Sequence, residues 1–102
     1  MAEVFTLVVD VGRKAGDGLP KRATGATLVC FSAGVDEAEA VRETVRVLKD
    51  AGLAPLDVTG YGSAAEREAE GDEIGEEERE LMARALAENA VIVAEMTPVL
   101  KI

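Results

Sequence analysis

Apolar and polar positions follow their clearest pattern between residues 26 and 61. The apolar run at residues 27–31 predicts a buried strand, and the amphipathic stretch at 35–51 predicts a helix. A second, weaker strand is expected at residues 54–59. A strand that leads through a helix to another strand is typical of a parallel crossover connection, so this unit predicts a domain that mixes helices and strands.

The expected helix has signals at both ends. Asp36 can cap its first turn, and Glu39, three residues later, completes a pattern like a capping box. Gly52 suits the left-handed residue after a helix, and Pro55 prevents its continuation. Four apolar residues at helical spacing are expected to face the core: Ala38, Val41, Val45 and Leu48.

The first strand is predicted at residues 3–11. Its odd-numbered positions from Phe5 to Val11 are all apolar, and its other face is half apolar, so we expect both faces to be covered. Residues 12–25 then form a long, glycine-rich loop before the next strand.

The second half of the chain predicts two helices. After a break at residues 60–63, Ser63 and Glu66 form a capping-box pattern that can start a short helix at 64–70. A longer helix is predicted at residues 76–89. The apolar residues expected on its inner face are Leu81, Met82, Ala85 and Leu86.

Residues 90–97 fit two structures. The β-branched run at 91–93 favours a strand that reaches about Thr97. The spacing of Met82, Leu86, Val93 and Met96 instead fits a continuation of the second helix. We expect the strand, which gives the element order ββαβαβ.

The predicted fold class is α+β, with residues 1–102 in a single domain. The simplest packing is a two-layer sandwich, in which a four-stranded mixed sheet carries two helices on one face. This architecture resembles the ferredoxin-like fold, but a long loop replaces the usual helix between the first two strands. The residues identify no particular family.

Two helices on one face would leave the other sheet face uncovered. Val4, Val8 and parts of the 27–31 and 91–93 runs would point there, and large exposed apolar patches are uncommon on monomers. We therefore expect a homo-oligomer, most simply a two-fold dimer joined by sheet faces or edges. The alternative is that loop 12–25 or segment 63–75 folds over this face.

Composition excludes several classes of site. The chain has no histidine and one cysteine, which excludes histidine-dependent catalytic triads, histidine-ligated zinc and CxxC redox pairs. Cys30 lies in an apolar run and is expected to be a buried, unreactive side chain. No signal peptide or membrane-spanning run is evident, so we expect a cytoplasmic protein without a membrane partner.

The net charge of −9 is unevenly distributed. Residues 66–80 contain nine acidic residues and two arginines, whereas the 12–25 loop contains four cations and one aspartate. The acidic run lacks the spacing of a calcium loop, so we assign no metal and no cofactor. It can instead meet the basic loop of another copy or a protein partner. Nucleic-acid binding is not expected, because the net charge repels phosphate.

Five residues are candidates for ligand binding. Four cations of the loop can attract an anion that its glycines let approach the backbone: Arg13, Lys14, Lys21 and Arg22. The alternative is a solvated, mobile hairpin tip. Tyr61, flanked by two glycines, can contact a ligand in a crevice, or its ring can pack on the core while its hydroxyl reaches water.

The leading functional hypothesis is a non-enzymatic binding or regulatory module that acts as a homo-oligomer. The alternative is a small ferredoxin-like enzyme with a pocket between sheet and loops, using carboxylate groups, Tyr61, or Arg13 and Arg22. No catalytic residue can be assigned, so the sequence leaves open whether the chain is an enzyme. A deep pocket with buried, pKa-shifted groups would favour the enzyme, and a flat apolar patch would favour the binding module.

Overall fold

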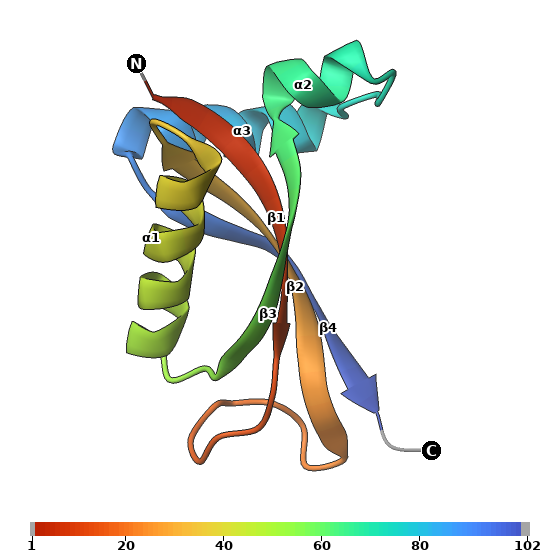
Figure 1. Ribbon diagram of the computed structural model, residues 1–102. Coiled ribbons are helices and arrows are strands. Elements are labelled where there is room, and N and C mark those ends of the chain that lie inside the picture. The colour runs from red at the N-terminus through yellow and green to blue at the C-terminus, as the bar shows by residue number, and fades with distance from the viewer. Residues whose placement is uncertain (1, 101–102) are drawn as a thin grey trace.

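The computed structural model describes residues 2–100. Within them the chain forms four strands and three helices (Figure 1). The strands are β1 (Glu3–Val11), β2 (Ala23–Gly34), β3 (Pro55–Ser63) and β4 (Val91–Leu100); the helices are α1 (Glu37–Asp50), α2 (Ala64–Ala69) and α3 (Glu76–Glu88). This arrangement confirms the α+β class and the strand at the start of the 90–97 region.

The four strands form an antiparallel sheet in the order β3-β1-β2-β4. β1 pairs with β2 across the β1–β2 loop (residues 12–22), β3 pairs with β1, and β4 pairs with β2. The predicted mixed sheet is therefore wrong. β2 and β3, which α1 connects, run in the same direction, but β1 lies between them and separates their backbones.

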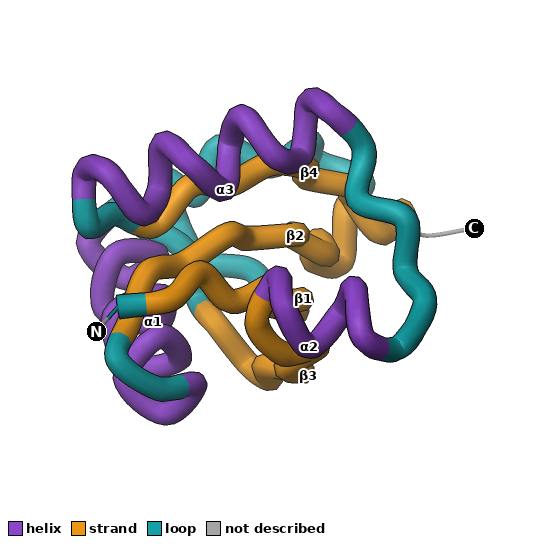
Figure 2. Tube along the Cα trace, turned by 90° about the horizontal axis from the view of Figure 1, so that it is seen from above, coloured by secondary structure: helices purple, strands orange, loops and turns teal. Residues whose placement is uncertain are grey.

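The two long helices lie on opposite faces of the sheet, not on one face as predicted (Figure 2). Successive side chains of a strand point to opposite faces, and the central strand β1 is apolar on both. Phe5 and Leu7 of β1 pack with Ala40 of α1, whereas Val4 packs with Met82 of α3. The ferredoxin-like arrangement is not reproduced, because each face of β1 carries its own long helix.

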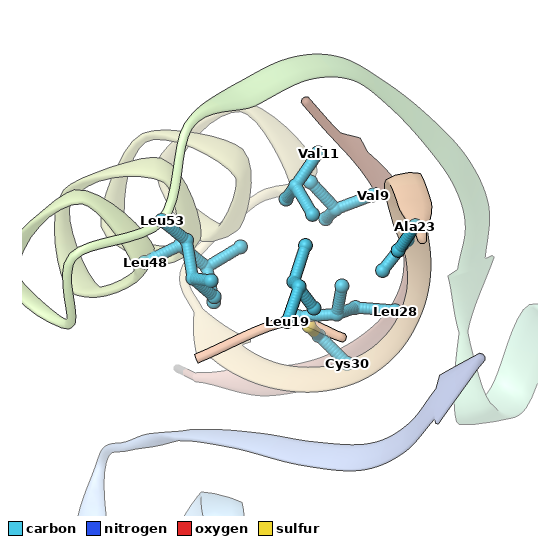
Figure 3. Packing of buried hydrophobic residues seen from close by; sticks show 9 residues of the cluster. Val9, Val11, Leu19, Ala23, Leu28, Cys30, Leu48 and Leu53 are labelled. Carbon is cyan, nitrogen blue, oxygen red and sulfur yellow. The ribbon is translucent and has the colours of Figure 1, made fainter. Parts of the chain in front are cut away.

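The larger core cluster lies between α1 and the sheet (Figure 3). Leu48 of α1 and Leu53 of the following turn point toward Val9 of β1 and Leu28 of β2. Leu19 of the β1–β2 loop belongs to the same buried cluster. Since all of these side chains are aliphatic, the core depends on close packing of small branched groups rather than on aromatic rings.

The start of α1 confirms the predicted cap. The Asp36 carboxylate accepts a hydrogen bond from the Glu39 amide at 2.8 Å. The Glu39 carboxylate accepts from the amide of Val35, one residue before the cap, at 3.2 Å. Both bonds satisfy backbone donors that the first helical turn cannot pair internally.

The buried face of α1 differs from the predicted apolar stripe. It consists of Ala40, Thr44 and Leu48, of which Leu48 was predicted, while Ala38 is exposed. Thr44 can be buried because its hydroxyl donates to the Ala40 carbonyl at 2.7 Å. That bond uses its one proton, so the Ser32 hydroxyl of β2 must donate to Thr44 Oγ1. A satisfied polar pair thus joins α1 to the sheet.

The connection from β3 into α2 combines a bulge with a cap. Ser63 and Glu66 form the predicted capping box, in which each side chain accepts from the other's backbone amide. The predicted break at residues 60–63 is wrong, because β3 continues to Ser63. Gly62 has a φ of 90°, and the register with β1 shifts nearby. A bulge bends a strand without ending it.

The C-terminal elements follow the prediction with two differences. α3 ends at Glu88 and is capped by Asn89, which adopts the left-handed conformation with a φ of 49°. Met82 and Ala85 face the core, but Leu86, which was expected to do so, is exposed. β4 continues through Pro98 to Leu100, since an edge strand tolerates proline better than a central one.

The sheet face that was expected to be uncovered is covered next to α3. Val4 and Phe31 are buried there together with Ile74 from the segment between α2 and α3. Arg67 of α2 fastens this segment, because its guanidinium donates to the Thr6 hydroxyl of β1 at 3.0 Å. The alternative, in which segment 63–75 folds over this face, therefore describes the structure. No uncovered sheet face remains here to favour a dimer joined face to face.

Replacement of Leu48 by alanine should lower the free energy of unfolding by about 2–5 kcal/mol, because it leaves a cavity between α1 and the sheet. Leu56→Ala is the matched control, since the same atoms are removed from a side chain that is 73% exposed. Its free energy of unfolding should change by no more than about 0.5 kcal/mol. Urea denaturation followed by circular dichroism compares the two, and equal losses would contradict the buried position of Leu48.

Replacement of Thr44 by valine should cost about 1–3 kcal/mol although it preserves shape, because the Ser32 hydroxyl loses its buried acceptor. Ser32→Ala in the same background should then add little. A double-mutant cycle measures this coupling. Fully additive losses would show that the two hydroxyls do not form a single bonded pair.

Candidate functional site

Arg13 is the structural centre of the β1–β2 loop. Its guanidinium donates to both carboxylate oxygens of Asp17, at 3.0 and 3.3 Å. It also donates to the carbonyls of Pro20 at 2.7 Å, Ala23 at 2.6 Å and Leu19 at 3.5 Å. These bonds use all five N–H donors of the guanidinium. Arg13 therefore holds the shape of the loop and has no donor left for an anion.

Asp17 completes this arrangement from the opposite side. Its carboxylate accepts from the backbone amides of Lys14 at 2.8 Å and Leu19 at 3.0 Å, and its side chain is only 2% exposed. The amide bonds, that of Lys14 first, together with Arg13 hold the pKa of Asp17 below its ordinary value. The loop is thus built to stabilise a charged carboxylate.

The other three candidate cations of the loop are exposed. Lys14 and Lys21 line a wide hollow of about 500 Å³ that is largely open to solvent, and Arg22 follows directly after Lys21. A ligand in such a hollow would keep most of its surface in water. Lys14, Lys21 and Arg22 are therefore better placed to give this end of the molecule a positive field than to enclose a small anion.

Tyr61 lies at the opposite end of the sheet. Its side chain is 54% exposed and lines a hollow of about 300 Å³ with three glutamates: Glu37, Glu66 and Glu70. The Glu66 carboxylate is already engaged in the cap of α2. The side chain of Glu37 lies directly over Gly60, where a Cβ would collide with it. Tyr61 is therefore framed by acidic groups and not by the cations of the loop.

The structure does not bring the five candidate residues into one site. Tyr61 is close to Ser63, which pairs with Phe5 at the start of β1, whereas the β1–β2 loop begins where β1 ends. Figure 1 shows that loop at one end of the molecule and α2 at the other. A catalytic site that combines Tyr61 with Arg13 is excluded by this separation.

A larger hollow lies between α1 and the turn that joins α3 to β4. It has a volume of about 580 Å³ and is lined by charged residues of α1 and by residues 89–91. Arg46 on its wall is bonded to Glu43 at 2.7 Å and to Asp50 at 3.3 Å. The hydrogen bond from Arg46 lowers the pKa of Glu43. Glu43, Arg46 and Asp50 are thus paired with one another along the outer face of α1, as their spacings of three and four residues allow.

The exposed side of β4 carries several large apolar side chains. β4 is an edge strand, and in residues 2–100 its partner in the sheet is β2. Four large apolar side chains along it are 40–58% exposed: Val93, Met96, Val99 and Leu100. Sequence reasoning identified the strand but missed this surface, because the pattern alone does not show which strands lie at an edge. We call these four residues the β4 apolar strip.

Cys30 has the structural role expected from the sequence. Its side chain is fully buried, and burial raises the pKa of the thiol to about 11, so it is protonated at neutral pH. Over the part of the chain that the structure describes, no three acidic or cysteine side chains are grouped to hold a metal ion. None of the helices within residues 2–100 is long and apolar enough to span a membrane.

Replacement of Asp17 by asparagine should loosen the β1–β2 loop, because Arg13 loses its charged partner and the loop amides lose a strong acceptor. Trypsin should then cut faster after Lys14 and Lys21.

The Asp17 pKa is lowered on folding, so the stabilisation that Asp17 provides is present above the ordinary value near 4 and is lost as the pH falls through the lower folded value. Loop amide exchange in the unmodified protein should therefore match that of Asp17→Asn only in strong acid. Equal exchange at pH 7 would contradict the role of Asp17.

Comparison with known proteins gives one family. A family described as "Domain of unknown function (DUF8846)" matches residues 4–100, which include all three helices and, apart from Glu3 at the start of β1, all four strands of the structure. Comparisons with curated proteins and with solved structures give no match. Because the match covers nearly the whole chain, the protein belongs to the family described as Domain of unknown function (DUF8846).

Proposed function

We propose that this protein is a non-enzymatic binding module that acts as a homo-oligomer. The observation that carries the proposal is the β4 apolar strip, four large side chains exposed together on one edge strand. A long, apolar edge strand is a surface on which a second polypeptide can bury side chains and pair its backbone. This surface replaces the sheet face from which self-association was first expected.

The ionisable groups with shifted pKa values favour binding over catalysis. Hydrogen bonds lower the pKa of Asp17, through the amide of Lys14 first, and that of Glu43, through Arg46. These shifts move both pKa values farther from neutral pH, whereas proton transfer is most efficient when the pKa lies near the working pH. The pKa of Cys30 is raised by burial among aliphatic side chains, and that of Arg46 is raised by its hydrogen bond to Glu43.

The enzyme alternative would have to use the hollow beside Tyr61. That hollow places a phenol next to three glutamates, which is a setting that can attract a positively charged group. The residues that line it include no arginine or lysine, so an enzyme of this kind would have to use Tyr61 and carboxylate groups without Arg13 or Arg22. A cytoplasmic location also stays part of the proposal, supported by the free, buried thiol of Cys30.

Native mass spectrometry of the freshly purified protein should show a species of two chains, each of 10.7 kDa, because the β4 apolar strip is self-complementary across a two-fold axis. Dilution through the micromolar range should convert it to single chains. A small molecule retained beside the monomer would instead support the enzyme alternative, and Tyr61→Ala tests whether that molecule uses the tyrosine hollow. A single-chain mass at all concentrations would contradict the homo-oligomer.

A further inference from the structure

The geometry points to a second copy of this chain, docked along β4 with the two β4 strands antiparallel, as the partner of the β4 apolar strip. This inference rests on the proposed homo-oligomer and adds its interface and orientation. It depends on three observations: the apolar residues of β4, the free edge of that strand, and the distribution of charge along its length.

The apolar strip lies mainly on one face of β4. Cross-strand partners share a face, so Val93 and Met96, which pair with the buried Cys30 and Leu28, lie on the α1 side. Leu100 pairs with Ala23 of the same core cluster. In Figure 3 β4 passes outside the curl of strands that encloses this core. The strip is therefore an extension of the aliphatic core beyond the reach of α1.

The charge of the molecule is separated along the direction of β4. The strand begins after α3, at the end where residues 66–80 carry nine acids and two arginines. It ends where Leu100 pairs with Ala23, next to Arg22 and Lys21 of the β1–β2 loop. The molecule is elongated, with extents of 39 × 25 × 20 Å, and its acidic and basic ends lie apart (Figure 1).

Antiparallel docking of two copies follows from this separation. It sets the acidic end of each copy beside the basic end of the other, and a two-fold axis makes that match twice. A parallel arrangement would bring the two acidic ends together and repel. The same chain thus supplies both the apolar strip and the complementary charges, which an unrelated partner would have to match by its own sequence.

The backbone edge of β4 limits how the two strands can pair. Pro98 has no N–H to donate, and the register between β2 and β4 shifts next to Cys30, which marks a bulge. Both features are common protections against uncontrolled strand addition. The contact between copies should therefore rely on burial of the β4 apolar strip, with only a short hydrogen-bonded ladder, and it should end at two copies.

Met96→Glu tests the interface. It places a charge in the middle of the strip, and the dissociation constant of the dimer should rise at least 100-fold by analytical ultracentrifugation. Leu56→Glu is the matched control, because it adds the same charge to the other edge strand at an exposed leucine, and it should leave the constant within about threefold. Circular dichroism checks that both variants fold. An unchanged constant for Met96→Glu would overturn the β4 interface.

Charge reversal tests the orientation. Lys21→Glu should weaken the dimer about tenfold at low salt, because the basic end would then repel the partner's acidic end. Arg42→Glu, in the half of α1 farther from the β1–β2 loop, makes the same change in net charge at an exposed site and should have a smaller effect. Equal effects of the two variants would overturn the end-to-end charge match.

Spin labels separate the orientations directly. Cys30 is buried, so a cysteine introduced at Met96 or Leu100 takes the label selectively. Antiparallel docking about an axis near Met96 places the two labels at position 96 close together. The two labels at position 100 should lie roughly 25–35 Å apart, because each is four residues from the axis and a strand rises about 3.3 Å per residue. Equal separations at both positions would overturn this inference and leave the homo-oligomer intact. A single-chain mass for the unlabelled protein would instead overturn the proposed function itself.

Discussion

The whole structure depends on the burial of β1 on both of its faces. β1 is one of the two strands that pair with neighbours on both sides, and its side chains alternate between the cluster under α1 and the cluster under α3. Because β1 has apolar side chains on both faces, each face needs a covering helix, and the two long helices pack on opposite faces. The segment around Ile74 and Arg67 then closes the second layer, where a helix alone would leave Val4 in water.

Much of the fold could be predicted because its local signals are independent of tertiary contacts. The caps at Asp36 and Ser63 act within one helical turn, so the sequence determines them directly. The position of α1 on the sheet depends instead on distant neighbours. Thr44 faces inward because Ser32 of β2 offers a hydroxyl, and a pattern based on hydrophobicity alone assigns such a threonine to the surface.

The candidate site was harder to predict, because it too depends on contacts between residues that are distant in the sequence. The four loop cations look equivalent in the sequence. In the structure, however, Arg13 donates all of its hydrogen bonds to Asp17 and three backbone carbonyls, while Lys21 is exposed to solvent. Which residues are free depends on the conformation of the loop. The β4 apolar strip was missed because exposure of a strand depends on its place in the sheet, and the strand order emerges only when the chain is folded.

The β1–β2 loop also has a consequence for how the chain folds. β3 can pair only with β1 and β4 only with β2, so both edge strands need the β1–β2 hairpin as their template. Closing that hairpin requires an eleven-residue loop, numbered 12–22, and the entropy of closure must be overcome before any edge strand can add. Arg13 and Asp17 pair within this loop, only four residues apart. Their ion pair offsets part of that entropy, so a contact within the loop favours the hairpin to which both edge strands add.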